Sequence, residues 1–225
     1  MPNITVIIPA LNEAGNIKRL VEEVQAIGAA EVIVVDNGST DATAYEAQAG
    51  GARVVYEPRR GYGFACSAGV AAAEGAEILA FLDGDYSFLP RELPILLDPI
   101  LAGRADFVLG SRALGRIEPG SMPLHQHLGN WLVARLMNAI YKLSITDLGP
   151  YRAIRRPLLL QLAMREMSYG WPTEMIVKAA RRKARILEVP VSYQNRRAGR
   201  SKVSGTIKGS ILAAWHILRV ALSQS

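Results

Sequence analysis

Five short apolar runs, separated by segments of helical periodicity, constrain the fold of this chain more than any other feature of its sequence. The runs cover residues 4–8, 31–35, 53–56, 77–82 and 106–110. Their length and their richness in Val, Ile and Leu are typical of buried strands. Between the first two runs, apolar residues recur at helical spacing, at Ile17, Leu20, Val21, Val24 and Ile27. Alternation of strands and helices predicts an α/β protein with a mostly parallel sheet and helices on both of its faces.

Three helices are predicted between these strands. We expect the first to begin after Asn12, a residue type that caps helix N-termini, and the next two to lie at residues 67–76 and 93–103. A chain of 225 residues, 50% hydrophobic and 20% charged, belongs to the ordinary globular class, and one domain with extensions is the simplest organisation.

Small and polar residues follow four of the apolar runs. They occupy positions 9–13, 36–41, 59–63 and 83–85. Each segment alone could be a turn or a helix cap, because Asn, Asp, Gly and Ser are the usual turn formers. Ligands of open α/β sheets, however, bind beyond the carboxyl ends of the strands. Four polar ends from one sheet therefore favour a nucleotide site.

Asp83 and Asp85 stand two positions apart, with a glycine between them, directly after an apolar run. Two carboxylates at a strand end can share a hard divalent cation that also takes diphosphate oxygens. A single D-x-D pattern is more often a turn than a metal site. Its place among the other polar strand ends favours the metal site.

Cysteine content and the N-terminal sequence bear on the cellular compartment. Cys66 is the single cysteine, which excludes an intramolecular disulfide framework and a multi-cysteine metal site. The N-terminus has no basic stretch followed by a long apolar one, as a secretory signal would. We expect a cytoplasmic protein, with peripheral contact at the inner face of a membrane as an open alternative.

Charge is distributed unevenly along the chain. Residues 1–100 carry 6 Lys/Arg and 14 Asp/Glu, whereas residues 101–225 carry 20 and 6. Residues 178–208 contain ten of the basic residues, opposed only by Glu188. Such asymmetry favours a polyanionic partner, for which nucleic acid, a membrane surface and a phosphorylated substrate all qualify on charge alone. A solvated positive face is the alternative.

Seven motifs follow one another between residues 3 and 208: IIPALNEAGNI, VVDNGSTDAT, RGYGFACSAGVAAAEGAEILAFLDGDYSF, GSR, DLGPYRAIRR, YGWPTEM and RRAGRSKVSG. Together they resemble the family 2 glycosyltransferases of the GT-A fold, in particular the dolichol-phosphate mannose synthase group and its bacterial polyprenyl-phosphate sugar transferase relatives. The resemblance implies a GT-A domain over residues 1–204, with a basic C-terminal extension and a terminal amphipathic helix at 205–225.

The resemblance also implies roles for the residues near the donor. The nucleoside pocket would be lined by Pro9, Leu11 and Glu13, and Asp36 would bond the base or the ribose. Asp83 and Asp85 would hold the diphosphate of a UDP- or GDP-hexose through Mg²⁺ or Mn²⁺. DGDYS has Ser87 where the mannose synthases commonly have glutamine, so the sugar stays open.

On the acceptor side, the residues that match family positions near a phosphate are Arg112, Arg152, Arg196, Ser201 and Lys202. The family inverts the anomeric centre by direct displacement, and Glu174 is the candidate base. A phosphate monoester, with a second pKa of about 6, is already ionised at neutral pH and needs no base. Glu174 would then orient Arg or Lys side chains, and Asp147 has the same two possible roles.

A polyprenyl phosphate is the acceptor that the resemblance favours, and no nucleic acid partner is expected. Residues 205–222 are apolar but interrupted by Lys208, His216 and Arg219, so they are too short and too broken to span a membrane. They could lie at a membrane interface or pack on the domain or on a second subunit, and residues 123–143 have the same two interpretations.

Four other functions stay open at this stage. One is a glycosyltransferase that acts on a soluble or glycan hydroxyl, and another is a sugar nucleotidyltransferase, which would also pair acidic metal ligands with a nucleotide. A nicotinamide dehydrogenase ranks low, because the glycine pattern at 61–66 follows the third run and lacks its last glycine. A non-catalytic nucleotide-binding module is the fourth.

Overall fold

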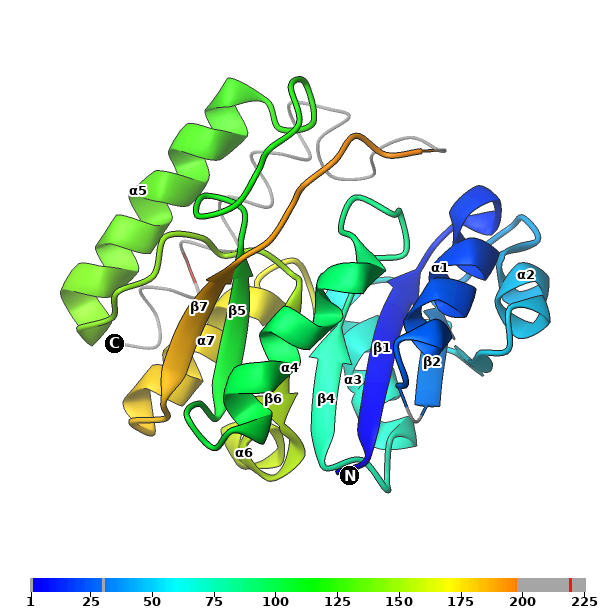
Figure 1. Cartoon of the computed structure of the whole chain (residues 1–225), viewed down its shortest axis with the longest axis horizontal. Coiled ribbons are helices and arrows are strands. Elements are labelled where there is room, and N and C mark those ends of the chain that lie inside the picture. Colours follow the sequence, from blue (N-terminus) through cyan, green and yellow to red (C-terminus); the bar gives the residue numbers. More distant parts are fainter. Residues whose placement is uncertain (1, 30, 198–218, 220–225) are drawn as a thin grey trace.

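The computed structural model describes residues 2–29, 31–197 and 219, and within them the chain forms one seven-stranded sheet (Figure 1). The strands are β1 (Ile4–Ala10), β2 (Glu31–Asp36), β3 (Arg53–Tyr56), β4 (Ile78–Phe81), β5 (Phe107–Ser111), β6 (Arg152–Arg155) and β7 (Ile186–Pro190). Their order across the sheet is β3-β2-β1-β4-β6-β5-β7. The five predicted strands are β1 to β5, so these predictions are confirmed.

The sheet is parallel except at β6. Strands β1 to β4 pair in parallel, and β5 pairs in parallel with β7. Strand β6 runs antiparallel between β4 and β5. The carboxyl ends of β1, β2, β3 and β4 consequently meet at one edge, and the prediction of a mostly parallel sheet is confirmed.

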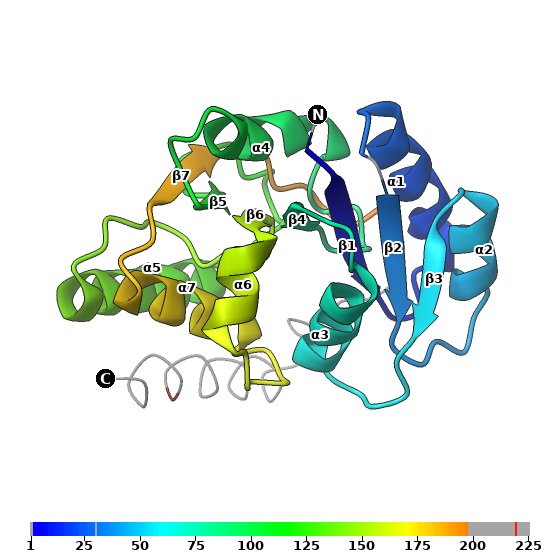
Figure 2. The same cartoon turned by 90° about the horizontal axis from the view of Figure 1, so that it is seen from below.

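Helices cover both faces of the sheet (Figure 2). They are α1 (Ala14–Ala26), α2 (Thr43–Ala49), α3 (Tyr62–Ala72), α4 (Leu93–Leu101), α5 (Leu124–Tyr141), α6 (Arg156–Leu162) and α7 (Trp171–Arg181), with a 3₁₀ turn at Pro90–Glu92. Helices α1, α2 and α4 contribute to the apolar cluster on one face, and α3, α5, α6 and α7 contribute to the cluster on the other. Helices on both faces were predicted.

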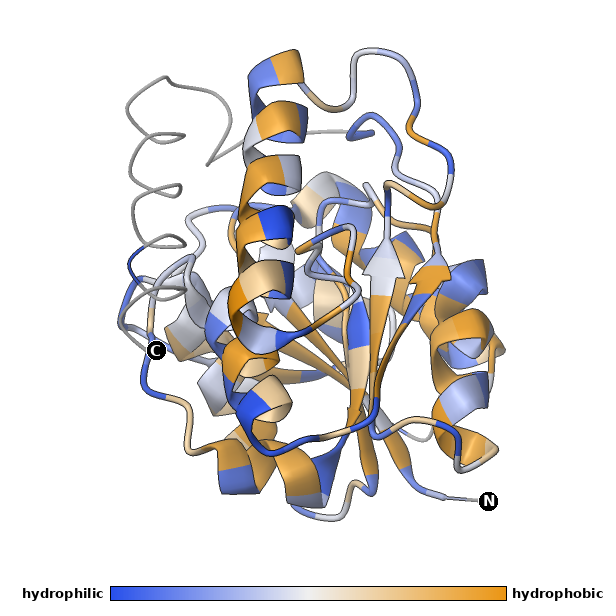
Figure 3. Ribbon diagram, turned by 90° about the vertical axis from the view of Figure 1, so that its left-hand side faces the viewer, coloured by the Kyte–Doolittle hydropathy of each residue, from blue (hydrophilic) through white to orange (hydrophobic). Residues whose placement is uncertain are grey.

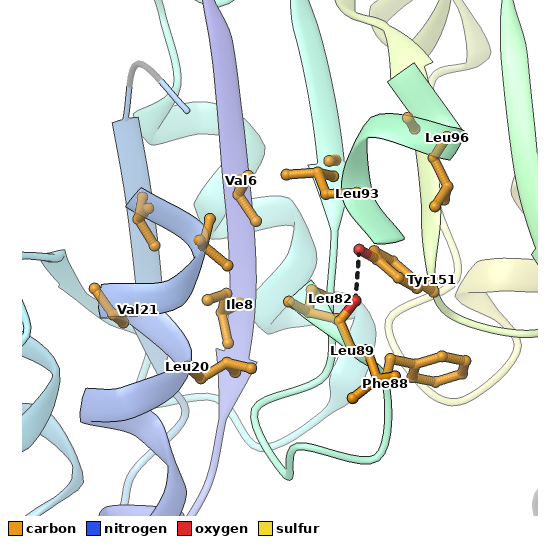
Figure 4. Packing of buried hydrophobic residues seen from close by; sticks show 14 of the residues in the cluster. Val6, Ile8, Leu20, Val21, Leu82, Phe88, Leu89, Leu93, Leu96 and Tyr151 are labelled. Carbon is orange, nitrogen blue, oxygen red and sulfur yellow. Dashed lines mark hydrogen bonds between the residues drawn. The ribbon is translucent and has the colours of Figure 1, made fainter. Parts of the chain in front are cut away.

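Side chains of the central strands alternate between the two clusters. On β1, Val6 and Ile8 pack against α1 and α4, whereas Ile7 points to the opposite face. Figure 4 shows the first of these clusters, in which the hydroxyl of Tyr151 donates to the backbone carbonyl of Leu89 at 3.3 Å. Burial on both faces explains why these strands read as continuous apolar runs.

The prediction that Asn12 caps α1 is wrong. The helix begins at Ala14, and Asn12 lies in the left-handed region with φ 51°. Its side-chain carbonyl instead accepts a hydrogen bond of 2.8 Å from the backbone N–H of Thr40. Asn12 thereby joins the segment after β1 to the segment after β2, at the edge where the strands end.

The proposed C-terminal helix at 205–225 lies outside the described residues, apart from Arg219, which pairs with Glu166 at 2.5 Å. Of the helices among the described residues, none combines the length and the apolar character that crossing a membrane requires.

Candidate active site

A pocket of about 230 Å³ opens at the edge where the parallel strands end. Its walls come from the segment after β1, from Asn37 after β2, from residues 60–62 between β3 and α3, and from residues 83–85 after β4. Tyr169 and Arg196, both distant in sequence, complete it. The predicted convergence of four polar strand ends is therefore confirmed.

Three of the predicted donor-site residues, Pro9, Leu11 and Glu13, line this pocket beside the aspartates, and so does Arg196, which was predicted to lie near a phosphate on the acceptor side. Asp36 does not. It is 6% exposed, and its Oδ1 accepts a 2.8 Å hydrogen bond from the backbone N–H of Ser39, three residues on, in the turn after β2. Its neighbour Asn37 supplies the pocket wall instead.

The two aspartates of the pocket have different environments. Asp85 is 5% exposed, and its Oδ1 accepts hydrogen bonds from the backbone N–H of Ser87 at 2.9 Å and from the Ser87 hydroxyl at 2.6 Å. Asp83 is half-buried, and its Oδ1 accepts a 3.2 Å hydrogen bond from the hydroxyl of Tyr62. Ser87, at the position that left the sugar open, therefore fixes the orientation of Asp85 in the predicted metal-binding motif.

Burial, reinforced by the adjacent negative charge of Asp85, raises the pKa of Asp83 to about 7. The hydrogen bond from Tyr62 and the positive charges of Arg196 and Arg112 act in the opposite direction. Two carboxylates held this close repel one another unless a cation lies between them. The pair has the electrostatic character of a cation site.

Asn37 connects two of the strand ends. Its side-chain N–H groups donate to the backbone carbonyls of Glu57 at 2.9 Å and Arg59 at 2.7 Å, and its Oδ1 accepts from the N–H of Gly61 at 2.9 Å. All three polar bonds go to the segment between β3 and α3. Asn37 thus fixes the position of Tyr62 relative to β2.

The start of α3 packs tightly on the segment before α7. Gly61 has φ 152°, and a Cβ at this position would come within 2.5 Å of the carbonyl of Met167. A side chain on Gly63 would collide with the backbone of Glu166 and Met167. These two glycines let the segment that carries Tyr169 approach the pocket, which is the reason for the G-x-G spacing.

Glu174 is 1% exposed and lies in the first turn of α7, outside the pocket lining. Its carboxylate accepts the backbone N–H groups of Arg165 and Glu166, at 3.0 and 2.8 Å, and pairs with the ammonium of Lys178 at 2.8 Å. All of these partners belong to α7 or to the segment before it. The arrangement fits the orienting role of the two predicted for Glu174.

Arg112 and Asp147 form a bidentate ion pair with both distances at 2.7 Å, and the backbone N–H of Arg112 also donates to Asp147. Burial alone would raise the pKa of Asp147, but the guanidinium of Arg112 lowers it below its ordinary value. Neither residue lines the pocket. The pair instead ties the end of β5 to the segment before β6.

Arg152 is fully buried and donates hydrogen bonds to backbone carbonyls, among them those of Pro172 at 2.8 Å and Leu148 at 3.3 Å. Burial lowers its pKa to about 10. The expectation that Arg152 contacts a phosphate is therefore wrong, because its donors hold the backbone before β6 and the start of α7. The other predicted phosphate contacts, Ser201 and Lys202, lie outside the described residues.

Arg196 is the basic residue from the C-terminal extension that the structure brings to the pocket. Its Nη2 lies 2.6 Å from Oδ2 of Asp85, and its Nη1 lies 3.6 Å from Oε1 of Glu13. A family model described as glycosyl transferase family 2 matches residues 5–162, which is more than half of the chain and includes all four strand ends around this pocket.

The chain belongs to glycosyl transferase family 2. The fold is of the GT-A type, as the motifs predicted, and the protein is a hexosyltransferase. An uncharacterised glycosyltransferase of Mycobacterium tuberculosis is 38% identical over 210 residues, which cover 93% of this chain and 94% of the relative. The undecaprenyl-phosphate mannosyltransferase of Micrococcus luteus is 31% identical over 241 residues, covering 96% and 97%.

Among solved structures, this family 2 glycosyltransferase is similar to glucosyl-3-phosphoglycerate synthase from Mycobacterium tuberculosis in complex with Mn²⁺, uridine diphosphate and glucosyl-3-phosphoglycerate. The TM-score is 0.78 at 26% identity, and the match covers 99% of this chain and 80% of that chain. The similarity extends over the whole sheet and both helical layers.

Four pocket residues of this glycosyltransferase were not predicted individually: Asn37, Arg60, Tyr62 and Tyr169. The first three stand within segments that the strand-end argument did single out, so their neighbourhood was predicted although their roles were not. Tyr169 opens the YGWPTEM motif, but the motif did not indicate that the packing of the segment before α7 on α3 would bring this residue to the pocket.

Proposed function

We propose that this family 2 enzyme transfers a hexose, with inversion, from a UDP- or GDP-hexose to a polyprenyl phosphate. The observation that carries the proposal is the meeting of two aspartates and an arginine in a pocket at the ends of parallel strands. The relative named undecaprenyl-phosphate mannosyltransferase supports the acceptor, and the neighbour solved with uridine diphosphate supports a nucleotide donor.

The donor lies across the strand ends in this proposal. Pro9, Leu11 and Glu13 flank the nucleoside, and Asp36 reaches the base or ribose once its hydrogen bond to the N–H of Ser39 is released. Asp83 and Asp85 hold the diphosphate through Mg²⁺ or Mn²⁺, an ion that neutralises the charge of the leaving nucleotide.

The donor atoms of the pocket fit a hard divalent cation. Carboxylate oxygens are its preferred protein ligands. Burial and the adjacent charge of Asp85 together raise the pKa of Asp83 to about 7, and a positive charge at the pair counters both effects. Among residues 2–29, 31–197 and 219, no group of three or more His, Cys, Asp or Glu side chains could hold a metal ion alone. The remaining ligands would therefore be diphosphate oxygens and water.

A phosphate acceptor fits the two arginines of the pocket lining, Arg60 and Arg196. The planar guanidinium of Arg196 suits a phosphate, and Lys202 is proposed to act with it. An ionised phosphate attacks without losing a proton, so the reaction needs no general base. The Glu174 carboxylate is then available to accept the backbone N–H groups of the segment before α7.

Peripheral contact with a membrane belongs to the same proposal. Helix α5 presents an apolar stripe to solvent, formed by Leu124 (82% exposed), Leu128 (60%), Leu132 (58%) and Trp131 (48%). Figure 3 shows apolar residues along this helix. The stripe contains no acidic residue, and the guanidinium of Arg135 lies 5.0 Å from the Trp131 ring. An apolar helix face with a basic border suits an anionic lipid surface.

Replacing Glu174 by Gln tests the acceptor class, with Asp85→Asn as the matched loss-of-metal variant. We expect Asp85→Asn to abolish transfer to polyprenyl phosphate. Glu174→Gln should lower kcat less than about tenfold, because removing a general base costs roughly 10²–10⁴ and none is needed here. Thermal unfolding of each variant reports any loss of fold.

The hydroxyl-acceptor alternative predicts the reverse for Glu174. A loss comparable to that of Asp85→Asn, in a protein that unfolds at the same temperature as the parent, would contradict the phosphate acceptor. Full activity in excess chelator would contradict the metal site.

A further inference from the structure

Arg196 pairs with Asp85, one of the two carboxylates that the donor-bound ion is proposed to use, and with Glu13. Its side chain is 27% exposed, its Nη2 lies 2.6 Å from Asp85 Oδ2, and its Nη1 lies 3.6 Å from Glu13 Oε1. The positive charge of Arg196 also lowers the pKa of neighbouring Asp83. The guanidinium therefore supplies the positive charge that this acidic end of the pocket requires.

Both oxygens of Asp85 are engaged in this arrangement. Oδ1 accepts the backbone N–H and the hydroxyl of Ser87, and Oδ2 pairs with Arg196. The Ser87 contacts are local to the DGDYS turn and fix the carboxylate in one orientation. Oδ2 is thus the atom of Asp85 that a divalent cation can reach, and the cation must displace Arg196 to do so.

The adjacent Arg197 is anchored in a different way. Its guanidinium lies 4.3 Å from the centroid of the Tyr86 ring, and Tyr86 itself is 2% exposed with φ 61°. The guanidinium of Arg19 lies 5.6 Å from the same ring. Arg197 therefore holds the backbone beside Arg196 through an aromatic contact and touches neither Asp85 nor Glu13 in the contacts that the structure gives.

We propose that Arg196 is a built-in counter-cation that competes with the divalent ion for Asp85 and becomes available to a phosphate only after that ion has displaced it. This inference rests on the metal site of the proposed function. A guanidinium and a divalent cation cannot share one carboxylate oxygen without strong repulsion, because like charges at contact distance in a pocket are poorly screened.

Displacement of Arg196 from Asp85 by the ion sets the order in which donor and acceptor bind. Binding of the ion with the donor diphosphate frees Arg196, and a free guanidinium can then bind the acceptor phosphate. By linkage, the factor by which the Arg196–Asp85 pair weakens binding of the ion equals the factor by which the bound ion weakens the pair. Arg196 would in this way delay acceptor binding until the donor is in place.

The test is a titration with Mn²⁺ alone, followed by the electron paramagnetic resonance of the free ion, on the full chain without nucleotide or acceptor. We expect Arg196→Ala to bind Mn²⁺ at least about fivefold more tightly than the parent, the size expected when a partly exposed ion pair no longer competes. Arg197→Ala removes the same charge one residue away and should change the affinity less than about twofold.

Asp85→Asn separates the inference from the proposal on which it rests. If Asp85→Asn loses Mn²⁺ while Arg196→Ala binds it no more tightly than the parent, the counter-cation role is wrong and the metal site stands. Equal gains in Mn²⁺ affinity in Arg196→Ala and Arg197→Ala would also overturn the counter-cation role, because such gains would reflect only the change in net charge. If Asp85→Asn binds Mn²⁺ as the parent does, the metal site itself is wrong and the inference falls with it.

Discussion

At the scale of single residues, Asp83 depends on the hydroxyl of Tyr62. The hydrogen bond is 3.2 Å long, and it acts against the burial and the negative charge of Asp85 that together raise the pKa of Asp83 to about 7. Tyr62 also lies edge-on to Trp171, with ring centroids 6.5 Å apart, so its ring is fixed by packing. The hydroxyl is thereby positioned to orient one of the two carboxylates that are proposed to hold the metal ion.

Tyr62→Phe should weaken transfer roughly tenfold and raise the Mn²⁺ concentration needed for half-maximal rate, because a hydrogen bond to a charged group contributes about 1.5–3 kcal/mol. The ring packing is retained, so the unfolding temperature should change little. Steady-state rates over a range of Mn²⁺ concentrations measure the effect. Tyr45→Phe, at a 70% exposed position, is the control and should behave as the parent. An unchanged metal requirement in Tyr62→Phe would contradict the orienting role.

Much of the pocket could be predicted at the residue scale, and the exceptions have physical causes. Asp83, Asp85 and Glu13 lie where strand ends must meet in a parallel sheet, so their proximity follows from topology. Arg152 was misjudged because a fully buried arginine bonded to backbone carbonyls is indistinguishable, in sequence, from one that faces a phosphate. The family motif gave its position but not the direction of its side chain.

At the scale of elements, the ion pair between Arg112 and Asp147 joins the end of β5 to the segment before β6. The side chains are 15% and 1% exposed. The Asp147 carboxylate also accepts the backbone N–H of Leu148 at 2.7 Å. Glu188 on β7 accepts the backbone N–H groups of Thr146 and Asp147, at 2.8 and 3.0 Å. Charged side chains therefore join the end of β5 and the middle of β7 to the segment before β6.

Asp147→Asn should lower the free energy of unfolding by about 3 kcal/mol at pH 7, because it leaves a buried guanidinium without its partner. The folded-state pKa of Asp147 lies below the ordinary value of 3.8. The stabilisation is therefore complete above about pH 4 and is lost as the pH falls through the folded-state pKa. Urea unfolding at a series of pH values should show parent and variant converging in acid.

The control for this prediction is the exposed pair of Glu31 and Arg53, 3.2 Å apart with side chains 33% and 55% exposed. Glu31→Gln should change the free energy of unfolding by less than about 1 kcal/mol at any pH. A loss in Asp147→Asn no larger than that of Glu31→Gln would contradict the buried-pair account.

The strands that escaped prediction are β6 and β7. Strand β6 has arginine at both of its ends, and β7 carries Glu188 at its centre, so neither reads as an apolar run. Their charges are satisfied only by tertiary contacts, such as those of Arg152 to backbone carbonyls. A pattern rule that expects apolar strands fails where charged residues are paired after folding.

At the scale of the whole molecule, the apolar stripe of α5 lies on the sheet face opposite α1, α2 and α4. The buried side of the same helix, with Val133, Ala134 and Met137, packs in the core, so the stripe is a second apolar surface and not the core-facing one. Amphipathic helices of this kind bind the lipid interface through their exposed apolar residues.

The double variant Leu128→Glu and Leu132→Glu should reduce binding to phosphatidylglycerol vesicles at least about tenfold, because each large apolar side chain buried in lipid contributes about 1.5–3 kcal/mol. Vesicle sedimentation at low and high salt measures this binding. Binding of the parent protein to the vesicles should weaken as the salt concentration rises. Ile95→Glu, on α4 at a 42% exposed position, is the control and should bind as the parent. A double variant that binds vesicles normally but no longer dimerises would assign the stripe to a second subunit.

The most direct measurement of the account is transfer of a labelled hexose from UDP- and GDP-hexoses, with Mn²⁺ or Mg²⁺, to three acceptors presented side by side: a polyprenyl phosphate, the same polyprenol without phosphate, and a soluble alcohol. We expect a labelled polyprenyl-phosphate hexose from at least one donor, and we expect this product to be lost in Asp85→Asn. Neither of the two hydroxyl acceptors should give a labelled product. Transfer to the polyprenol or the soluble alcohol, with none to the polyprenyl phosphate, would contradict the account.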